Sequence, residues 1–176
     1  MNKIIIIGNE SIDKINIAKS IISKNDNLTI VPRFSTDINE DIAQINDLYT
    51  YFLNPNIINL SYKNNSLLFV TTKKYVTWGV TIDDFYNNDI LCCEYNEFND
   101  ISNVIFDTYD ILTIWIDSSQ NKTKNDINEA KFINERLQNH KYLYYLNESE
   151  ENITNEIIRY LDATEEEQNE IIFDNN

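Results

Sequence analysis

The run Lys3-Ile4-Ile5-Ile6-Ile7-Gly8 is continuously apolar after its first residue and ends at one of only two glycines in 176 residues. A short β-branched run of this kind is typical of a strand buried on both faces of a parallel sheet. The apolar residues that then recur at helical spacing are Ile15, Ile17, Ala18, Ile21 and Ile22. A strand, a polar loop and an amphipathic helix in this order predict the start of a βαβ unit, and therefore an α/β fold.

Further strands and helices alternate along the chain. Runs of β-branched and aromatic residues predict strands, and apolar residues at helical spacing predict helices. The predicted strands are residues 28–31 (ended by Pro32), 89–95, 111–116 and 141–146, and the predicted helices are residues 38–53, 81–88, 126–139 and 151–161, with an amphipathic element over 101–109. Residues 164–176 are acidic and predict a frayed helix or an interaction tail.

The middle of the chain differs from its flanks. Residues 57–62, 67–72 and 75–80 are rich in β-branched and aromatic residues and are separated by turn-forming residues. We therefore predict one α/β domain over residues 1–163, with a mostly parallel central sheet and a small antiparallel β insert at about residues 33–80. The acidic tail, residues 164–176, follows this domain.

The composition opposes several functional classes. Asp and Glu number 29 against 14 Lys and Arg, which gives a formal net charge of -15. This charge opposes binding to nucleic acid and to anionic membrane surfaces, and no apolar run approaches the roughly 20 residues of a spanning helix. We expect a soluble, cytoplasmic protein that binds neither nucleic acid nor membrane. Cys92 and Cys93 are adjacent in an apolar run, which indicates buried thiols, and no metal site is predicted.

The loop after the first strand is the candidate for chemistry, because ligands of parallel α/β sheets bind at the carboxyl ends of the strands. Its residues are Gly8, Asn9, Glu10, Ser11, Ile12, Asp13, Lys14, Ile15 and Asn16. Gly8 and Lys14 have the spacing of Gly-x-x-x-x-Gly-Lys-Ser/Thr, in which backbone N–H groups converge on phosphate at a helix N-terminus. Asp13 stands at the second glycine, and Ile15 replaces the magnesium-binding hydroxyl.

Two interpretations of this loop are open. In one, Lys14 contacts the phosphates of a nucleotide, and Asn16 reaches magnesium from one residue beyond the usual hydroxyl. In the other, Gly8 only permits a turn, Asp13 stabilises the helix N-terminus, and Lys14 pairs with Asp13. The carboxylates of Glu10 and Asp13 oppose triphosphate binding, by roughly 1 to 4 kcal/mol per charge pair at about 4 Å.

The order of segments along the chain resembles the guanylate kinase family. Residues 27–33, Asn-Leu-Thr-Ile-Val-Pro-Arg, resemble the strand before the arginine that contacts the nucleotide monophosphate, and residues 51–54 resemble the aromatic Tyr-Phe-Val-Ser segment. Residues 75–81, Tyr-Val-Thr-Trp-Gly-Val-Thr, resemble the end of the monophosphate-binding insert, and residues 89–94 resemble the strand that follows it. Residues 111–117, the next helix, residues 142–147 and the closing helix resemble the last third of the family.

This resemblance implies a three-layer P-loop kinase-like fold, with ATP and Mg²⁺ as cofactors if the protein is active. The substrate-binding positions that it implies are Arg33, Tyr51, Trp78, Gly79 and Glu94. The chain departs from the family in its cations, because it holds only three arginines. The arginine-rich lid of the family corresponds here to residues 117–125, which supply only Lys122 and Lys124.

Three functions are open at this point. The leading interpretation is a degenerate guanylate kinase-like protein, catalytically impaired or inactive, that binds a nucleotide or a protein partner in the former monophosphate cleft. The alternative is an active nucleoside or deoxynucleoside monophosphate kinase that transfers phosphate from ATP to GMP or dGMP, with Lys14 on the phosphates and Arg33 on the acceptor. The third is a structural α/β protein whose similarity is architectural. Hydrolase chemistry lacks support, because nothing places a nucleophile beside His140, the single histidine.

Overall fold

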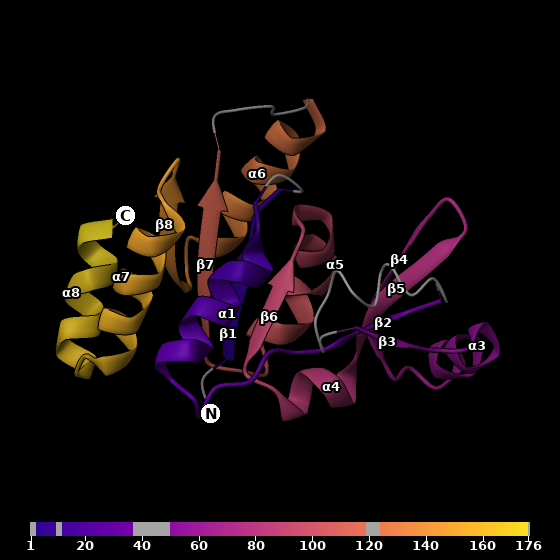
Figure 1. The fold of residues 1–176 in the computed structure, drawn as a ribbon. Helices are drawn as coiled ribbons and strands as arrows, with labels where there is room; N and C mark the ends of the chain where they lie inside the picture. Colours follow the sequence, from indigo (N-terminus) through magenta and orange to yellow (C-terminus); the bar gives the residue numbers. More distant parts are fainter. Residues whose placement is uncertain (1–2, 10–11, 37–49, 119–123, 176) are drawn as a thin grey trace. The chain divides into compact units, whose positions relative to one another are not determined.

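The computed structural model describes residues 3–9, 12–36, 50–118 and 124–175 (Figure 1). The chain divides into two compact units. The first unit comprises Met1–Thr29 and Ile90–Asn176, and the second comprises Ile30–Asp89.

The first unit is built on a four-stranded parallel sheet in the order β6-β1-β7-β8. Its strands are β1 (Lys3–Ile7), β6 (Ile90–Cys93), β7 (Ile111–Asp117) and β8 (Lys141–Leu146). Ile7 of β1 lies opposite Cys93 on one side and opposite Trp115 on the other. Every residue of β1, β6 and β7 is buried, which confirms the prediction of a first strand covered on both faces.

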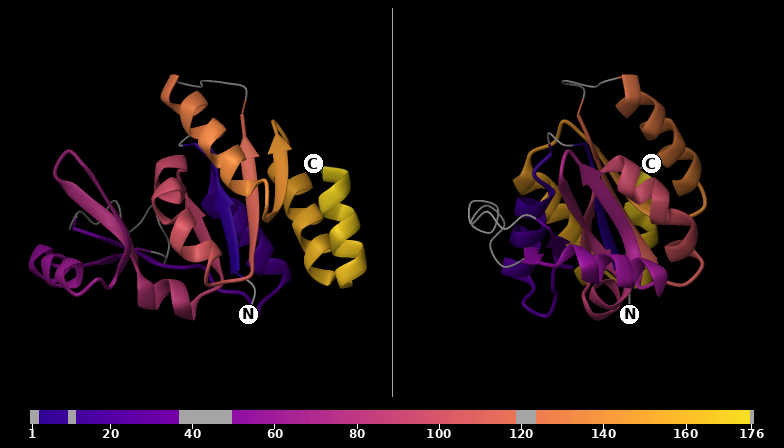
Figure 2. Two further views of the ribbon diagram at one scale, coloured as in Figure 1. Left: turned by 180° about the vertical axis from the view of Figure 1, so that it is seen from behind. Right: turned by 90° about the vertical axis from the view of Figure 1, so that its right-hand side faces the viewer.

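Helices cover both faces of this sheet (Figure 2). They are α1 (Lys14–Lys24), α5 (Tyr95–Phe106), α6 (Lys124–Leu137), α7 (Glu150–Asp162) and α8 (Glu165–Asn175). α1 packs with α7 on one face, α5 packs with α6 on the other, and α8 packs against α7 and β8. The predicted alternation of strands and helices is confirmed, and the acidic tail forms a helix that contacts the body of the first unit.

The core of the first unit consists of the β1 side chains and the apolar stripe of each covering helix. Ile17 and Ile21 of α1 are at most 1% exposed, as are Ile153 and Ile157 of α7. Full burial of such a side chain contributes about 1.5 to 3 kcal/mol relative to exposure. The helical spacing of these isoleucines therefore determines which face of each helix lies on the sheet.

The second unit holds a mixed four-stranded sheet in the order β3-β2-β5-β4. Its strands are β2 (Arg33–Ser35), β3 (Thr50–Phe52), β4 (Leu67–Lys73) and β5 (Val76–Thr81), and its helices are α3 (Pro55–Lys63) and α4 (Ile82–Asn87). β4 and β5 form an antiparallel hairpin, and β2 pairs antiparallel with β5 but parallel with β3. The small β insert is therefore confirmed, with one parallel pair of strands inside it.

Three predicted elements around this unit differ from the structure. Residues 57–62 are helical instead of extended, because Asn54 accepts a hydrogen bond from the Asn56 N–H as an N-cap and Pro55 suits the first helical turn. Residues 28–31 contain only an isolated bridge at Ile30, and the strand begins after Pro32. Of the predicted helix 38–53, residues 37–49 lie outside the described residues, and residues 50–52 form β3.

Candidate functional site

The C-terminal edge of the parallel sheet carries the loop that follows β1. The Gly8 N–H donates to the carbonyl of Cys93 at 3.3 Å, which continues the pairing of β1 with β6. A Cβ on Gly8 would lie 3.0 Å from the Ile116 carbonyl oxygen and 3.2 Å from the Cβ of Ile12. Close packing between two neighbouring strands therefore favours glycine at this position, whether or not the loop binds a ligand.

Helix α1 begins directly after this loop. Asp13 is its N-cap, and the Asp13 carboxylate accepts a hydrogen bond from the Asn16 N–H at 3.1 Å. The Ile12 N–H donates to the Asn9 carbonyl at 3.1 Å and closes the turn before the helix. A carboxylate at this position favours the helix N-terminus, as one of the two interpretations predicted. Residues 10 and 11, predicted as part of the loop, lie outside the described residues.

Lys14 is buried, with 7% of its side chain exposed, although it is the first residue of α1. Its Nζ atom lies 2.9 Å from Oε1 of Glu94 and donates to the carbonyls of Asn9 at 2.9 Å and Ile12 at 3.2 Å. An ammonium group has three N–H donors, so these three partners use all of them. The ion-pair partner of Lys14 is thus Glu94, and the predicted pairing with Asp13 is wrong.

Glu94 joins β6 to α5, and its backbone N–H donates to the carboxylate of Glu97 at 2.8 Å. Because β6 lies beside β1, the end of β6 is adjacent to the loop that holds Lys14. The Glu94 side chain is 31% exposed, so one side of the ion pair faces solvent. The structure therefore places Glu94, one of the predicted substrate-binding residues, against Lys14 in the first unit.

A second polar cluster surrounds Asp117 at the end of β7, and sequence analysis did not predict it. Asp117 is buried, and its carboxylate accepts hydrogen bonds from the Tyr95 hydroxyl at 3.0 Å, the Ser118 N–H at 2.9 Å and the Tyr144 hydroxyl at 3.2 Å. The Trp115 Nε1–H donates in turn to the Tyr95 hydroxyl at 3.4 Å. The available signal was an aspartate that ends an apolar strand, with Tyr144 inside the neighbouring strand β8 and Tyr95 just after β6, two strands away.

Burial and the nearby carboxylate determine how these tyrosines titrate. Burial raises the pKa of Tyr144 to about 12, and the charge and hydrogen bond of Asp117 act in the same direction. Burial also raises the pKa of Tyr95 above its ordinary value, partly offset by the hydrogen bond from Trp115. Both hydroxyls are therefore protonated at neutral pH and act as donors to Asp117.

The other predicted substrate-binding residues lie in three adjacent strands of the second unit. They are Arg33 in β2, Tyr51 in β3, and Trp78 and Gly79 in β5. Tyr51 and Gly79 both lie opposite Phe34 in the register of the sheet. Because successive side chains of a strand alternate between faces, Tyr51 shares the face of Phe34, whereas Arg33 and Trp78 belong to the opposite face.

The Tyr51 hydroxyl is bound within the second unit. It donates to Oδ2 of Asp84 at 2.7 Å, and the Thr81 hydroxyl donates to the same oxygen at 2.6 Å. Burial and the Asp84 carboxylate raise the pKa of Tyr51 above its ordinary value, so this hydroxyl is protonated at neutral pH. Tyr51 thereby joins β3 to the first turn of α4.

Packing alone requires glycine at position 79. A Cβ there would lie 2.3 Å from the Phe69 carbonyl oxygen and 2.8 Å from Cζ of Phe34, which is closer than real Cβ contacts allow. On the other face, the Arg33 guanidinium lies over the Phe69 ring, 5.4 Å from its centroid, in a cation–π contact. Gly79 of the Trp-Gly pair that carried part of the resemblance is therefore explained by close packing within the sheet.

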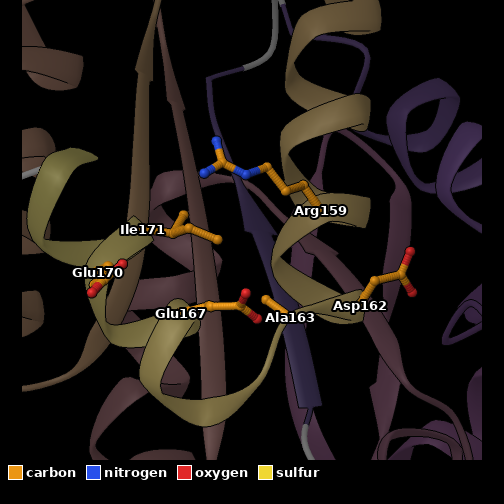
Figure 3. A pocket seen from close by; sticks show the side chains of 6 residues that line it. All are labelled: Arg159, Asp162, Ala163, Glu167, Glu170 and Ile171. Carbon is orange, nitrogen blue, oxygen red and sulfur yellow. The ribbon is translucent and has the colours of Figure 1, made fainter.

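A groove between α7 and α8 was not predicted from the sequence (Figure 3). Its volume is about 500 Å³, and its lining residues are Arg159, Asp162, Ala163, Glu167, Glu170 and Ile171. The backbone and side-chain hydrogen bonds of Thr164 lower the pKa of Glu167. Since α7 starts just after β8 and runs back along the sheet, the groove lies at the opposite end of the sheet from Lys14. Its three carboxylates and single guanidinium do not favour a phosphate ligand.

Neither a metal-binding cluster nor a membrane-spanning helix is present among the described residues. Within them, no three His, Cys, Asp or Glu side chains are grouped so that they could hold a metal ion. Likewise, none of the helices in this part of the chain combines the length and apolar character needed to cross a membrane.

Comparison with known proteins shows similarity of fold. The sequence matches no protein-family model and no curated protein at a significant level. Among solved structures, the guanylate kinase from Anaplasma phagocytophilum is similar to this chain with a TM-score of 0.61 and 13% sequence identity, over 91% of this chain and 84% of that one. At this identity the similarity concerns the fold alone. The chain therefore has a guanylate kinase-like α/β fold, as the order of its sequence segments indicated.

Proposed function

We propose that this protein is a guanylate kinase-like binding module that does not transfer phosphoryl groups. The observation that supports this proposal is the set of partners around Lys14. The ammonium group that would contact nucleotide phosphates is buried and donates to two backbone carbonyls, and its third partner is the Glu94 carboxylate. A phosphate could bind this cation only by displacing at least one of these three partners.

The residues around Lys14 do not fit a magnesium–nucleotide complex. Asp13, at the position of the second glycine in the phosphate-binding pattern, holds a carboxylate at the helix N-terminus. Each close pair of carboxylate and phosphate charges opposes binding by roughly 1 to 4 kcal/mol. Ile15 stands where a hydroxyl would hold magnesium, and its side chain offers no ligand atom.

A binding role is consistent with the residues of the second unit. Arg33 and Trp78 belong to one face of the mixed sheet, on which the Arg33 guanidinium lies over the Phe69 ring. A guanidinium and an aromatic ring on one face can bind a planar anion by charge and stacking. We propose that this face contributes to binding a nucleoside monophosphate or an acidic segment of a protein partner. A nucleoside monophosphate can be tested directly by titration with the pure compound. An acidic protein segment requires the partner to be identified first.

The experiment is calorimetric titration with ATP, GMP and dGMP, with and without Mg²⁺, together with an assay of ADP release. We expect no ADP release and no binding of ATP by the wild-type protein. Binding of GMP or dGMP alone, abolished in Arg33→Ala, would identify the monophosphate as the ligand. The absence of a heat of binding with all three nucleotides would favour the acidic protein segment as the ligand.

A set of variants tests whether the residues around Lys14 prevent the binding of ATP and magnesium. The triple variant Asp13→Gly, Ile15→Ser, Glu94→Gln removes two carboxylates and supplies a hydroxyl, so we expect it to bind ATP in a magnesium-dependent manner. The matched control adds Lys14→Met to the triple variant and is expected to lose that binding. Turnover by the wild-type protein would overturn the proposal in favour of an active monophosphate kinase.

A further inference from the structure

Helix α3 of the second unit exposes apolar side chains. Ile57 is 48% exposed and Leu60 is 59% exposed, and their spacing of three residues puts them on one face of the helix. Ile58 is the only buried residue of this helix. Phe52, just before the helix, is 50% exposed, and Tyr62 in its last turn is 67% exposed. We call the side of α3 that carries Ile57 and Leu60 the α3 face.

The sequence around the α3 face contains no acidic residue. Residues 48–82 hold no Asp or Glu, although the chain has 29 of them in 176 residues, or about one in six. The same 35 positions hold three lysines, Lys63, Lys73 and Lys74. About six acidic residues would be expected there at the average frequency. The α3 face therefore lies in an acid-free stretch of a strongly acidic protein.

We propose that the α3 face binds the same face of a second copy of this chain. A two-fold interface places a surface patch against its own copy, so a patch whose charges share one sign meets like charges. Like charges brought together at an interface cost several kcal/mol, and all 29 acidic residues lie outside residues 48–82, together with only 11 Lys and Arg. The apolar α3 face escapes this repulsion. The proposal is independent of any nucleotide or protein ligand of the site described above.

The size of the α3 face predicts a weak dimer. At 150 to 250 Å² for a large side chain, the fractional exposures of Phe52, Ile57 and Leu60 correspond to roughly 300 Å² per copy. A standard stable interface buries about 800 Å² per partner. Since the two copies also repel each other through their net charge of -15, we expect a dissociation constant on the order of 100 µM.

Sedimentation equilibrium of the full chain tests the proposal, from about 10 µM to about 1 mM protein. We expect a monomer–dimer equilibrium that becomes at least about threefold tighter between about 50 mM and about 500 mM NaCl, because salt screens the repulsion between the two acidic bodies. Leu60→Glu puts a carboxylate into the interface and is expected to weaken the dimer at least about tenfold. Ile57→Glu should act in the same direction.

The matched control is Asn59→Glu, which adds the same charge to the same helix. Asn59 is exposed and lies about 160° around the helix from Ile57, so this variant should change the dissociation constant by less than about threefold. Circular dichroism of each variant checks that the chain is folded. A monomer under all conditions would overturn the proposal. Equal weakening by Leu60→Glu and Asn59→Glu, or a dimer that dissociates in high salt, would overturn it as well.

Discussion

The Nζ atom of Lys14 lies 2.9 Å from Oε1 of Glu94, so a buried cation at the start of α1 is bound by a carboxylate at the end of β6. The two residues are 80 positions apart in the sequence and meet because β6 pairs with β1 in parallel. This ion pair connects two of the loops at the C-terminal edge of the sheet. It therefore stabilises the same edge on which a ligand of this fold would be bound.

Removal of the charge at Glu94 is the first test of this ion pair. Glu94→Gln leaves the Lys14 ammonium buried with only carbonyl partners, so we expect the free energy of unfolding to fall by about 1 to 3 kcal/mol. The lower part of this range reflects the partial exposure of the Glu94 side chain. Urea unfolding at neutral pH measures the change.

The control is a double-mutant cycle with Lys14→Met. If the two side chains interact as the structure describes, the double variant is more stable than the sum of the single changes predicts, by about 1 kcal/mol or more. Additive effects would contradict a direct interaction between Lys14 and Glu94.

Gly79 provides a test of the packing of the second unit. Gly79→Ala puts a methyl group against the Phe69 carbonyl and the Phe34 ring, so we expect destabilisation by about 1 to 3 kcal/mol or more. Gly8→Ala is the comparison, because its nearest contact is 3.0 Å instead of 2.3 Å. Unfolding followed by tryptophan fluorescence should rank Gly79→Ala as the more damaging change, and the reverse order would contradict the register of β5.

The first unit could be predicted from the sequence because its signals are local and agree with one another. The isoleucine run of β1 and the helical spacing of Ile17 and Ile21 each identify one element and its buried face. The second unit was harder to predict. Residues 57–62 include two isoleucines and a tyrosine, which favour a strand, yet the cap at Asn54 and the proline at position 55 start a helix there. Local capping thus outweighed strand propensity, which is a weak preference.

The candidate site was predicted only in part, because its partners come from distant strands. The loop after β1 and the N-terminal role of Asp13 follow from residues next to one another in the sequence. The pairing of Lys14 with Glu94 depends on strand order, which no local pattern contains. The same holds for Asp117, whose donors Tyr95 and Tyr144 follow or lie on other strands.

Helix α8 is expected to lose its first turn in acid. The Glu167 carboxylate accepts hydrogen bonds from the backbone N–H and the hydroxyl of Thr164, at 2.8 and 2.9 Å, and its pKa is lowered, chiefly by the backbone bond. Because the pKa of Glu167 is lowered in the folded protein, its carboxylate stabilises α8 fully above the ordinary pKa of 4.5. This stabilisation is lost as the pH falls below 4.5. Circular dichroism should therefore record less helix in acid.

Glu167→Ala should show the reduced helix content already at neutral pH and a smaller change on acidification. Glu166→Ala is the matched control, since it removes a neighbouring carboxylate of the same first turn. Identical acid transitions in the two variants would contradict a capping role for Glu167.

The tyrosines around Asp117 predict a loss of stability in base. The pKa of Tyr144 is raised from 10.0 to about 12 in the folded protein. The contribution of its protonated hydroxyl to the free energy of unfolding is therefore complete below pH 10 and is lost as the pH rises from 10 to about 12. Since Tyr144 is only partly buried, the slope should stay below the about 1.4 kcal/mol per pH unit of one fully coupled proton. Tyr144→Phe has no hydroxyl to ionise, so its free energy of unfolding should fall less over this interval. Tyr75→Phe is the control, because it removes a hydroxyl from a side chain that is 99% exposed and should retain the wild-type slope of the free energy of unfolding against pH. Equal slopes in the wild type, Tyr144→Phe and Tyr75→Phe would contradict the hydrogen bond from Tyr144 to Asp117.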